Sequence, residues 1–82
     1  MSVATEMAVR AERLQADQAF VDACAALHRV YEQQWREAET PEMRELVWHR
    51  DAALTAVQQE LVKAVERGSF ETTEQTRRTT RG

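Results

Sequence analysis

The segment REAETPEM, residues 36–43, contains the clearest local signal in this 82-residue sequence. The Thr40 hydroxyl can cap a new helix, Pro41 suits the first helical position because its missing N–H needs no partner there, and Glu42 complements the positive end of the helix. The proline ring also forces residue 39 or 40 out of the helical region. The segment therefore predicts that one helix ends and another begins, with a turn at residues 39–40.

The residues before this turn are typical of one long helix, which we place at about residues 5–38. They include neither Gly nor Pro, and their apolar residues recur at steps of three, four and seven, as on one side of a helix. A strand would need strict alternation of apolar and polar residues, which this stretch lacks. The apolar set is Met7, Leu14, Phe20, Val21, Cys24, Leu27, Tyr31 and Trp35.

The residues after the turn predict a second helix at about residues 41–67. Gly68 offers a left-handed helix terminus, and Arg67 complements the negative helix end. Arg50 interrupts the apolar stripe, and we expect its aliphatic stem to pack while the guanidinium reaches solvent or an acid. The stripe consists of Met43, Val47, Leu54, Val57, Leu61, Ala64 and Val65.

Residues 69–82 form a polar tail after a helical part at residues 1–68. Five threonines, two glutamates and three arginines surround one aromatic residue, Phe70. No amphipathic face can be drawn through this segment, so we expect it to be disordered in isolation.

The predicted fold is all-α, an antiparallel two-helix hairpin, because so short a connection makes the helices fold back on each other. A straight continuation with a kink at Pro41 is the alternative. A chain of this size is near the limit at which one core outweighs the entropy of ordering the backbone. We therefore expect hairpins to complete their core by oligomerisation, with packing like that of a coiled coil.

Cysteine usage and hydropathy indicate a soluble, intracellular protein. The single cysteine, Cys24, cannot form an internal disulfide, and its apolar neighbours predict a small buried thiol in a reducing compartment. The N-terminal residues lack the pattern of a secretory signal, and charges interrupt every apolar run far short of the about 20 residues that span a bilayer.

No enzymatic activity, cofactor or metal site is predicted. His28 and His49 lie at similar distances from the turn and could meet in the hairpin to bind zinc or sense pH, but further ligands beyond Cys24 or an acid are lacking. Glu45 and His49 are four residues apart, which predicts a solvated side-chain contact.

Aromatic residues near the turn predict a protein interface. Trp and Tyr are favoured anchors at interfaces because they bury much area with few rotatable bonds. Trp35 continues the first apolar stripe, whereas Trp48 lies beside the second and belongs either to the hairpin core or to an interface. The predicted interface residues are Met7, Leu14, Tyr31, Trp35 and Trp48.

Three arginines in the last six residues are candidates for contact with phosphates or with a partner. Arg77, Arg78 and Arg81 follow an acidic body. Phosphate contacts need only positive charge and hydrogen-bond donors, but no recognition-helix arrangement accompanies these residues. A solvated tail is the alternative.

The stretch from Tyr31 to Gly68, YEQQWREAETPEMRELVWHRDAALTAVQQELVKAVERG, resembles a recurrent type of small helical protein encoded in tailed-phage genomes near capsid and terminase genes. The shared features are a Trp near the end of one helix, a Thr-Pro start, the run Arg-Glu-Leu-Val-Trp, and a long amphipathic helix closed by Gly. The resemblance covers slightly under half of the chain and contains no catalytic motif. It implies a phage or prophage origin and a role in virion assembly, with the protein in the host cytoplasm or the virion.

The favoured function is a non-enzymatic protein–protein interaction module, a phage structural or assembly component that forms homo-oligomers or binds other phage structural proteins. One alternative is a small regulator or inhibitor whose acidic body binds a host protein. The other is a nucleic-acid accessory protein that acts through its arginine tail. No membrane partner is expected.

Overall fold

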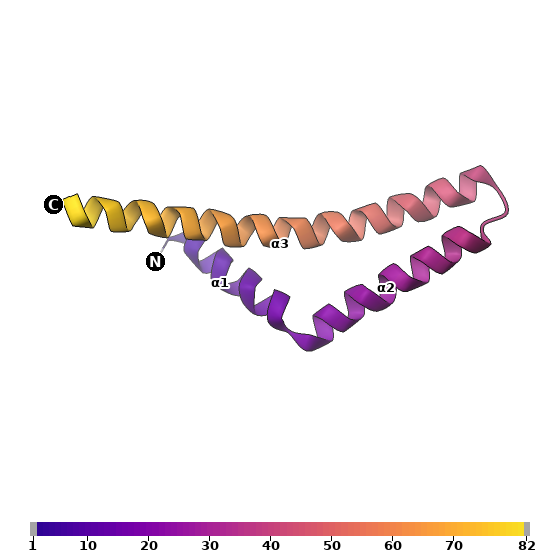
Figure 1. The fold of residues 1–82 in the computed structure, drawn as a ribbon, viewed down its shortest axis with the longest axis horizontal. Helices are drawn as coiled ribbons and strands as arrows, with labels where there is room; N and C mark the ends of the chain where they lie inside the picture. The colour runs from indigo at the N-terminus through magenta and orange to yellow at the C-terminus, as the bar shows by residue number, and fades with distance from the viewer. Residues whose placement is uncertain (1, 82) are drawn as a thin grey trace. The chain divides into compact units, whose positions relative to one another are not determined.

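The computed structural model describes the backbone of residues 2–81 and the side chains of residues 2–70. Within this range the chain forms three helices and no strand: α1, Val3–Ala16; α2, Gln18–Glu37; and α3, Pro41–Arg81 (Figure 1). The all-α prediction is therefore confirmed. The prediction of two helices is wrong, and both long helices differ from the expected ones.

The single helix expected at residues 5–38 is divided at Asp17. The Asp17 backbone is extended, at φ −70° and ψ 119°, and its Oδ1 accepts a hydrogen bond from Phe20 N–H at 3.0 Å. Asp17 is thus the N-cap of α2. Its side chain accepts a backbone N–H that would bond to a carbonyl oxygen in a continuous helix. As a result, α1 ends before Asp17 and α2 begins after it.

The start of α3 agrees with the sequence signal. Thr40 Oγ1 accepts a hydrogen bond from Met43 N–H at 3.1 Å, and Pro41 is the first helical residue. The preceding helix ends slightly earlier than expected, because Ala38 has an extended backbone with ψ 127°. The connection therefore spans residues 38–40 rather than 39–40.

The expected end of the second helix at residue 67 is also wrong, because α3 continues to Arg81. Gly68 has no positive φ and does not form a left-handed terminus. A Cβ placed on Gly68 would overlap Ala8 Cβ and lie 3.1 Å from the Ala4 carbonyl oxygen. The glycine therefore allows two helices to approach closely. The segment expected to be a disordered tail has a helical backbone up to Arg81.

The chain divides into two compact units, of which unit 1 comprises Met1–Ala16 and Gln59–Gly82. Here α1 packs on the later part of α3 through small residues: Ala8, Ala11 and Ala64 are 9%, 4% and 7% exposed, and Gly68 is buried. Ser2 Oγ accepts a hydrogen bond from Thr5 N–H at 3.1 Å and so caps the start of α1.

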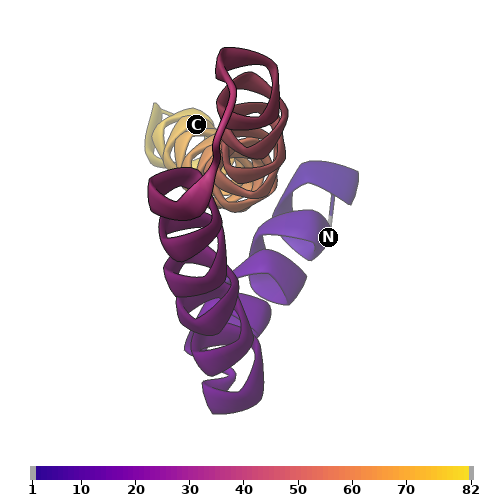
Figure 2. The same ribbon diagram turned by 90° about the vertical axis from the view of Figure 1, so that its right-hand side faces the viewer.

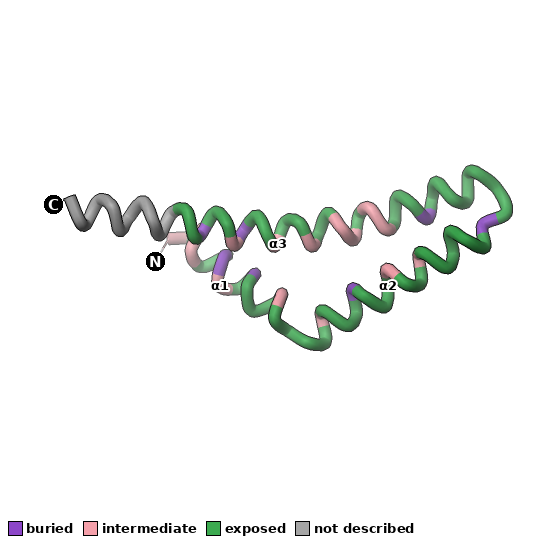
Figure 3. The backbone as a smooth tube through the Cα atoms, in the orientation of Figure 1, coloured by how far each residue is buried: buried purple, intermediate pink, exposed green. Residues whose placement is uncertain are grey.

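Unit 2 comprises Asp17–Gln58, in which α2 packs beside the first part of α3 (Figure 2). Its buried residues are Cys24, Ala38 and Val47. Cys24 is a free buried cysteine, as the sequence predicts. Figure 3 shows how few residues are buried in either unit, and among the described residues no side chain is completely enclosed.

Candidate interaction surface

Unit 2 exposes more large apolar side chains than it buries. Eight of them are between 41% and 60% exposed, although Cys24, Ala38 and Val47 are its buried residues. Scattered single apolar residues are normal on a protein surface, whereas a contiguous group of them often marks an interaction site. The eight are Val21, Leu27, Val30, Trp35, Met43, Leu46, Trp48 and Val57.

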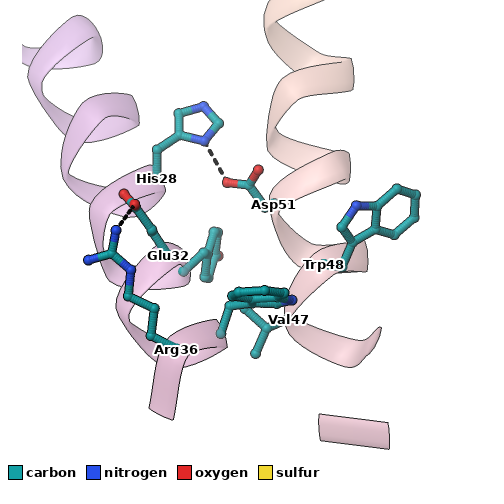
Figure 4. Close-up of a pocket in the computed structure, with 8 residues that line it drawn as sticks. His28, Glu32, Arg36, Val47, Trp48 and Asp51 are labelled. Atoms are coloured by element: carbon teal, nitrogen blue, oxygen red, sulfur yellow. Dashed lines mark hydrogen bonds and ion pairs between the residues drawn. The ribbon is translucent and has the colours of Figure 1, made fainter. Parts of the chain in front are cut away.

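A groove of about 530 Å³ lies between α2 and the first part of α3 (Figure 4). We call it the aromatic groove, because Tyr31, Trp35 and Trp48 line it together with Val47. It thus brings together the three aromatic residues that sequence reasoning placed near the turn. Trp35 and Trp48 are 48% and 60% exposed, and Tyr31 is half-buried.

His28, at one end of the aromatic groove, connects α2 to α3. Its Nδ1 lies 2.6 Å from Asp51 Oδ1, and its Nε2 lies 2.8 Å from Gln58 Oε1. Because both ring nitrogens face oxygen acceptors, the imidazolium form can donate a hydrogen bond to each. The hydrogen bond to Gln58, followed by the hydrogen bond to Asp51 and the charge of Asp51, raises the pKa of His28 above its ordinary value of 6.5, while burial opposes this shift.

A second charged pair lies along α2 in the same groove. Arg36 donates a hydrogen bond to Glu32 Oε1 at 2.7 Å, and both side chains are largely exposed. An exposed pair of this kind contributes little to stability. The charges of this pair cancel, and the third charged side chain of the groove, Asp51, is hydrogen-bonded to His28, so each of the three has a partner within the chain.

The other predicted residues lie elsewhere. Met7 and Leu14 are on α1 in unit 1, where they are 51% and 40% exposed. The side chains of Arg77, Arg78 and Arg81 lie outside the described residues. The predicted interface residues are therefore divided between the two units, with Met7 and Leu14 in unit 1 and Tyr31, Trp35 and Trp48 in unit 2.

His28 and His49, which could have met in the hairpin, do not pair with each other. His28 is bound by Asp51 and Gln58, whereas His49 lies 3.7 Å from Glu45 and stacks edge-on against Trp48, with ring centroids 5.2 Å apart. The predicted contact between Glu45 and His49 is exposed to solvent. Asp51 and Gln58 were missed, although their spacing of three and four residues from Leu54 places them on its side of the helix.

Leu46 was also missed, because it does not lie on the apolar stripe that the sequence suggested for the second helix. It is 52% exposed and lines a shallow groove with Met43 and Arg50. Arg50 is exposed at this groove. The spacing of Leu46 from Met43 and Val57 was the signal that could have identified a second stripe.

Residues 2–70 contain no group of three or more His, Cys, Asp or Glu side chains arranged to hold a metal ion. In the described part of the chain, no helix has the length and hydropathy of a membrane span. Comparison with models of protein families, with curated proteins and with solved structures gave no match.

Proposed function

We propose that this chain is a non-enzymatic protein–protein interaction module that completes its apolar core by associating with further copies of itself. The observation that carries the proposal is the balance of burial in unit 2, where eight large apolar side chains are exposed and three residues are buried. A second copy presents the same exposed apolar side chains on its amphipathic helices, and it is always present together with the first.

The free energies involved are of the right size for reversible association. Full burial of a large aliphatic side chain is worth about 1.5–3 kcal/mol, so a half-exposed one leaves about 1 kcal/mol unrealised. Unit 2 has six exposed side chains of this kind, so covering several of them on each of two copies yields a free energy comparable to the association cost of about 4–15 kcal/mol, and the balance is marginal. We therefore expect an oligomer whose population depends on concentration.

Assembly of a virion is the setting that the sequence resemblance suggests for this module. The chain would then act in the host cytoplasm or within the virion, and other structural proteins would be further partners. Purification of virions from a producing strain, followed by mass spectrometry, tests this setting separately from self-association.

The test of the module itself is the mass of the full chain in solution. Sedimentation equilibrium from about 1 to about 100 μM should show a mass that rises above the 9.4 kDa of one chain. A compact species of 9.4 kDa throughout this range would overturn the proposal. Far-UV circular dichroism at the lowest concentration establishes that the chain is folded.

A second candidate function is binding of a basic protein. Residues 17–58 contain eight Asp or Glu residues and four Arg residues, so unit 2 carries a formal charge of −4. Such a charge steers a basic partner toward it at low ionic strength. A monomeric chain that binds a basic partner with steep dependence on salt would favour this function over the first.

A further inference from the structure

His28 of α2 contacts two side chains of α3 that lie two helical turns apart, and we call these three residues the polar bridge. Its Nδ1 lies 2.6 Å from Asp51 Oδ1 (Figure 4), and its Nε2 lies 2.8 Å from Gln58 Oε1. Residues 51 and 58 are on nearly the same side of α3, because seven residues make about two turns. The ring therefore joins α2 to α3 at two points within unit 2.

The imidazolium form of His28 suits this arrangement. Each ring nitrogen then carries a proton, so the ring donates one hydrogen bond to Asp51 and one to Gln58. Its positive charge also lies beside the Asp51 carboxylate, and a hydrogen bond between charged groups is stronger than one between neutral groups. The direction of the pKa shift of His28, which is upward, agrees with this geometry.

A neutral ring cannot keep the same two hydrogen bonds. It carries one proton, and an ionised carboxylate only accepts, so the bond to Asp51 requires that proton on Nδ1. His28 Nε2 then presents a lone pair to Gln58 Oε1, which also only accepts. The contact survives if the Gln58 amide turns over, so that its nitrogen donates to the ring. Loss of one proton therefore alters both contacts of the polar bridge.

The charged groups around His28 leave Asp51 as the one that responds to its protonation. Among the described residues of α3, Asp51 is the charged residue that contacts the ring. On α2, Glu32 lies one turn after His28 and is bonded to Arg36 at 2.7 Å. Cys24 lies one turn before His28 and is buried.

The polar bridge has a large share in positioning α2, because little apolar surface is buried around it. The buried residues of unit 2 are Cys24, Ala38 and Val47. A segment with few buried apolar contacts opens locally at a small cost in free energy. A change in two side-chain hydrogen bonds is thus enough to change how often α2 separates from α3.

We propose that the polar bridge is a pH-sensitive switch. Protonated His28 holds α2 on the first part of α3 through both contacts, whereas loss of its proton turns the Gln58 amide over and weakens the pairing of the two helices. All three side chains belong to unit 2 of a single chain, so this inference does not rest on self-association. The paired state is favoured in mildly acidic solution and weakened in mildly alkaline solution.

Hydrogen exchange of the α2 amides tests the weakened pairing. After correction for the effect of pH on exchange itself, their protection should fall about 3-fold between about pH 6 and about pH 8.5, a small change because the bridge is partly exposed. His28→Gln should abolish the decrease, and His49→Gln, on an exposed contact, should retain it. All samples are kept at one concentration at which sedimentation gives the same mass at both pH values.

NMR of the unmodified chain tests the geometry of the switch without any substitution. The nitrogen resonances of the neutral imidazole should place its proton on Nδ1 of His28, and the side-chain amide resonances of Gln58 should shift in step with the titration of His28. Gln58→Glu supplies an acceptor that cannot become a donor while ionised, so it should move the titration to higher pH. Asp51→Asn should move the titration to lower pH.

Each measurement has a result that overturns the proposal. Protection of α2 that does not change with pH, or a decrease that persists in His28→Gln, shows that the bridge does not control the pairing of the helices. A neutral ring with its proton on Nε2 shows that the Gln58 amide does not turn over. A chain that stays monomeric contradicts the proposed function and leaves the switch standing.

Discussion

Unit 1 and unit 2 join their helices by different means. In unit 1, Ala8 meets Gly68 and Ala11 is buried, so two backbones approach closely and the interface contains small side chains. In unit 2, Val47 is buried and His28 bridges to Asp51 and Gln58 with hydrogen bonds of 2.6 and 2.8 Å. Small residues allow two main chains to pack closely. Hydrogen bonds between side chains instead fix the relative position of two helices, because they require a definite distance and angle.

Both units leave large apolar side chains exposed to solvent. Met7, Val62 and Phe70 of unit 1 are 51%, 45% and 69% exposed, and eight side chains of unit 2 are exposed to a similar degree. A pair of helices has a narrow contact, so it can cover one stripe on each helix and no more. The interior of each unit therefore specifies how its helices pair, while the remaining apolar surface is available to other chains.

A substitution at Gly68 tests the close approach of the helices in unit 1 and should reduce stability more than any other change proposed below. Gly68→Leu places a bulky side chain where even a Cβ overlaps Ala8, so we expect a loss of about 3 kcal/mol in the free energy of unfolding. The gain of about 1 kcal/mol in helix propensity does not offset this loss. Urea denaturation at fixed protein concentration measures the change. The matched control is Glu66→Leu at an exposed position of α3, and equal stability of the two variants would contradict the close contact.

A smaller effect tests the packing of unit 2. Val47→Ala removes two methyl groups from a side chain that is 7% exposed, so we expect a loss of about 2 kcal/mol. The control is Val21→Ala on α2, where the side chain is 43% exposed and the gain in helix propensity offsets most of the loss. Thermal unfolding followed by circular dichroism compares the two variants. A control that is as destabilised as Val47→Ala would show that Val47 is not part of the interior of unit 2.

The smallest effect concerns the polar bridge. Because folding raises the pKa of His28, the folded chain binds the proton of this side chain more tightly than the unfolded chain does. The stabilisation is therefore fully present below pH 6.5, and it is lost as the pH rises through the pKa of the folded state. We expect a loss of less than about 1 kcal/mol, because the side chain is 34% exposed and solvent screens the charge.

Unfolding by urea between about pH 5.5 and about pH 8.5 measures this dependence around the reference histidine value. His28→Gln should remove the decrease in stability with rising pH, and Asp51→Asn should reduce it. His49→Gln, whose contact with Glu45 is exposed and 3.7 Å long, serves as the control. A decrease that persists in His28→Gln would show that the bridge is not its source.

Local signals predicted some elements well and others badly. The Thr40 and Pro41 start was predictable because a cap and a proline act within one helical turn. Asp17 was missed because it stands in a run without Gly or Pro, and an aspartate in such a run is compatible with a surface helix position as well as with a cap. Its hydrogen bond from Phe20 distinguishes the two in the structure.

The histidines show the same limit for the candidate site. Distance from the turn left open a contact between His28 and His49, but the structure pairs His28 with Asp51 and Gln58. Side-chain direction, and not the number of residues from the turn, decides which groups meet across two helices. That direction depends on the rotation of each helix about its axis, which no local pattern of residues specifies.

By itself, the sequence determined the helical class, the turn near Pro41 and the helical spacing of the apolar residues, because helix propensity, capping and hydropathy are properties of neighbouring residues. Only the tertiary structure decided that Gly68 lies against Ala8 instead of ending a helix, and that Val47 turns inward while Leu46 turns outward. Both outcomes depend on where another helix lies and how closely it can approach, and this is a property of residues far apart in the chain.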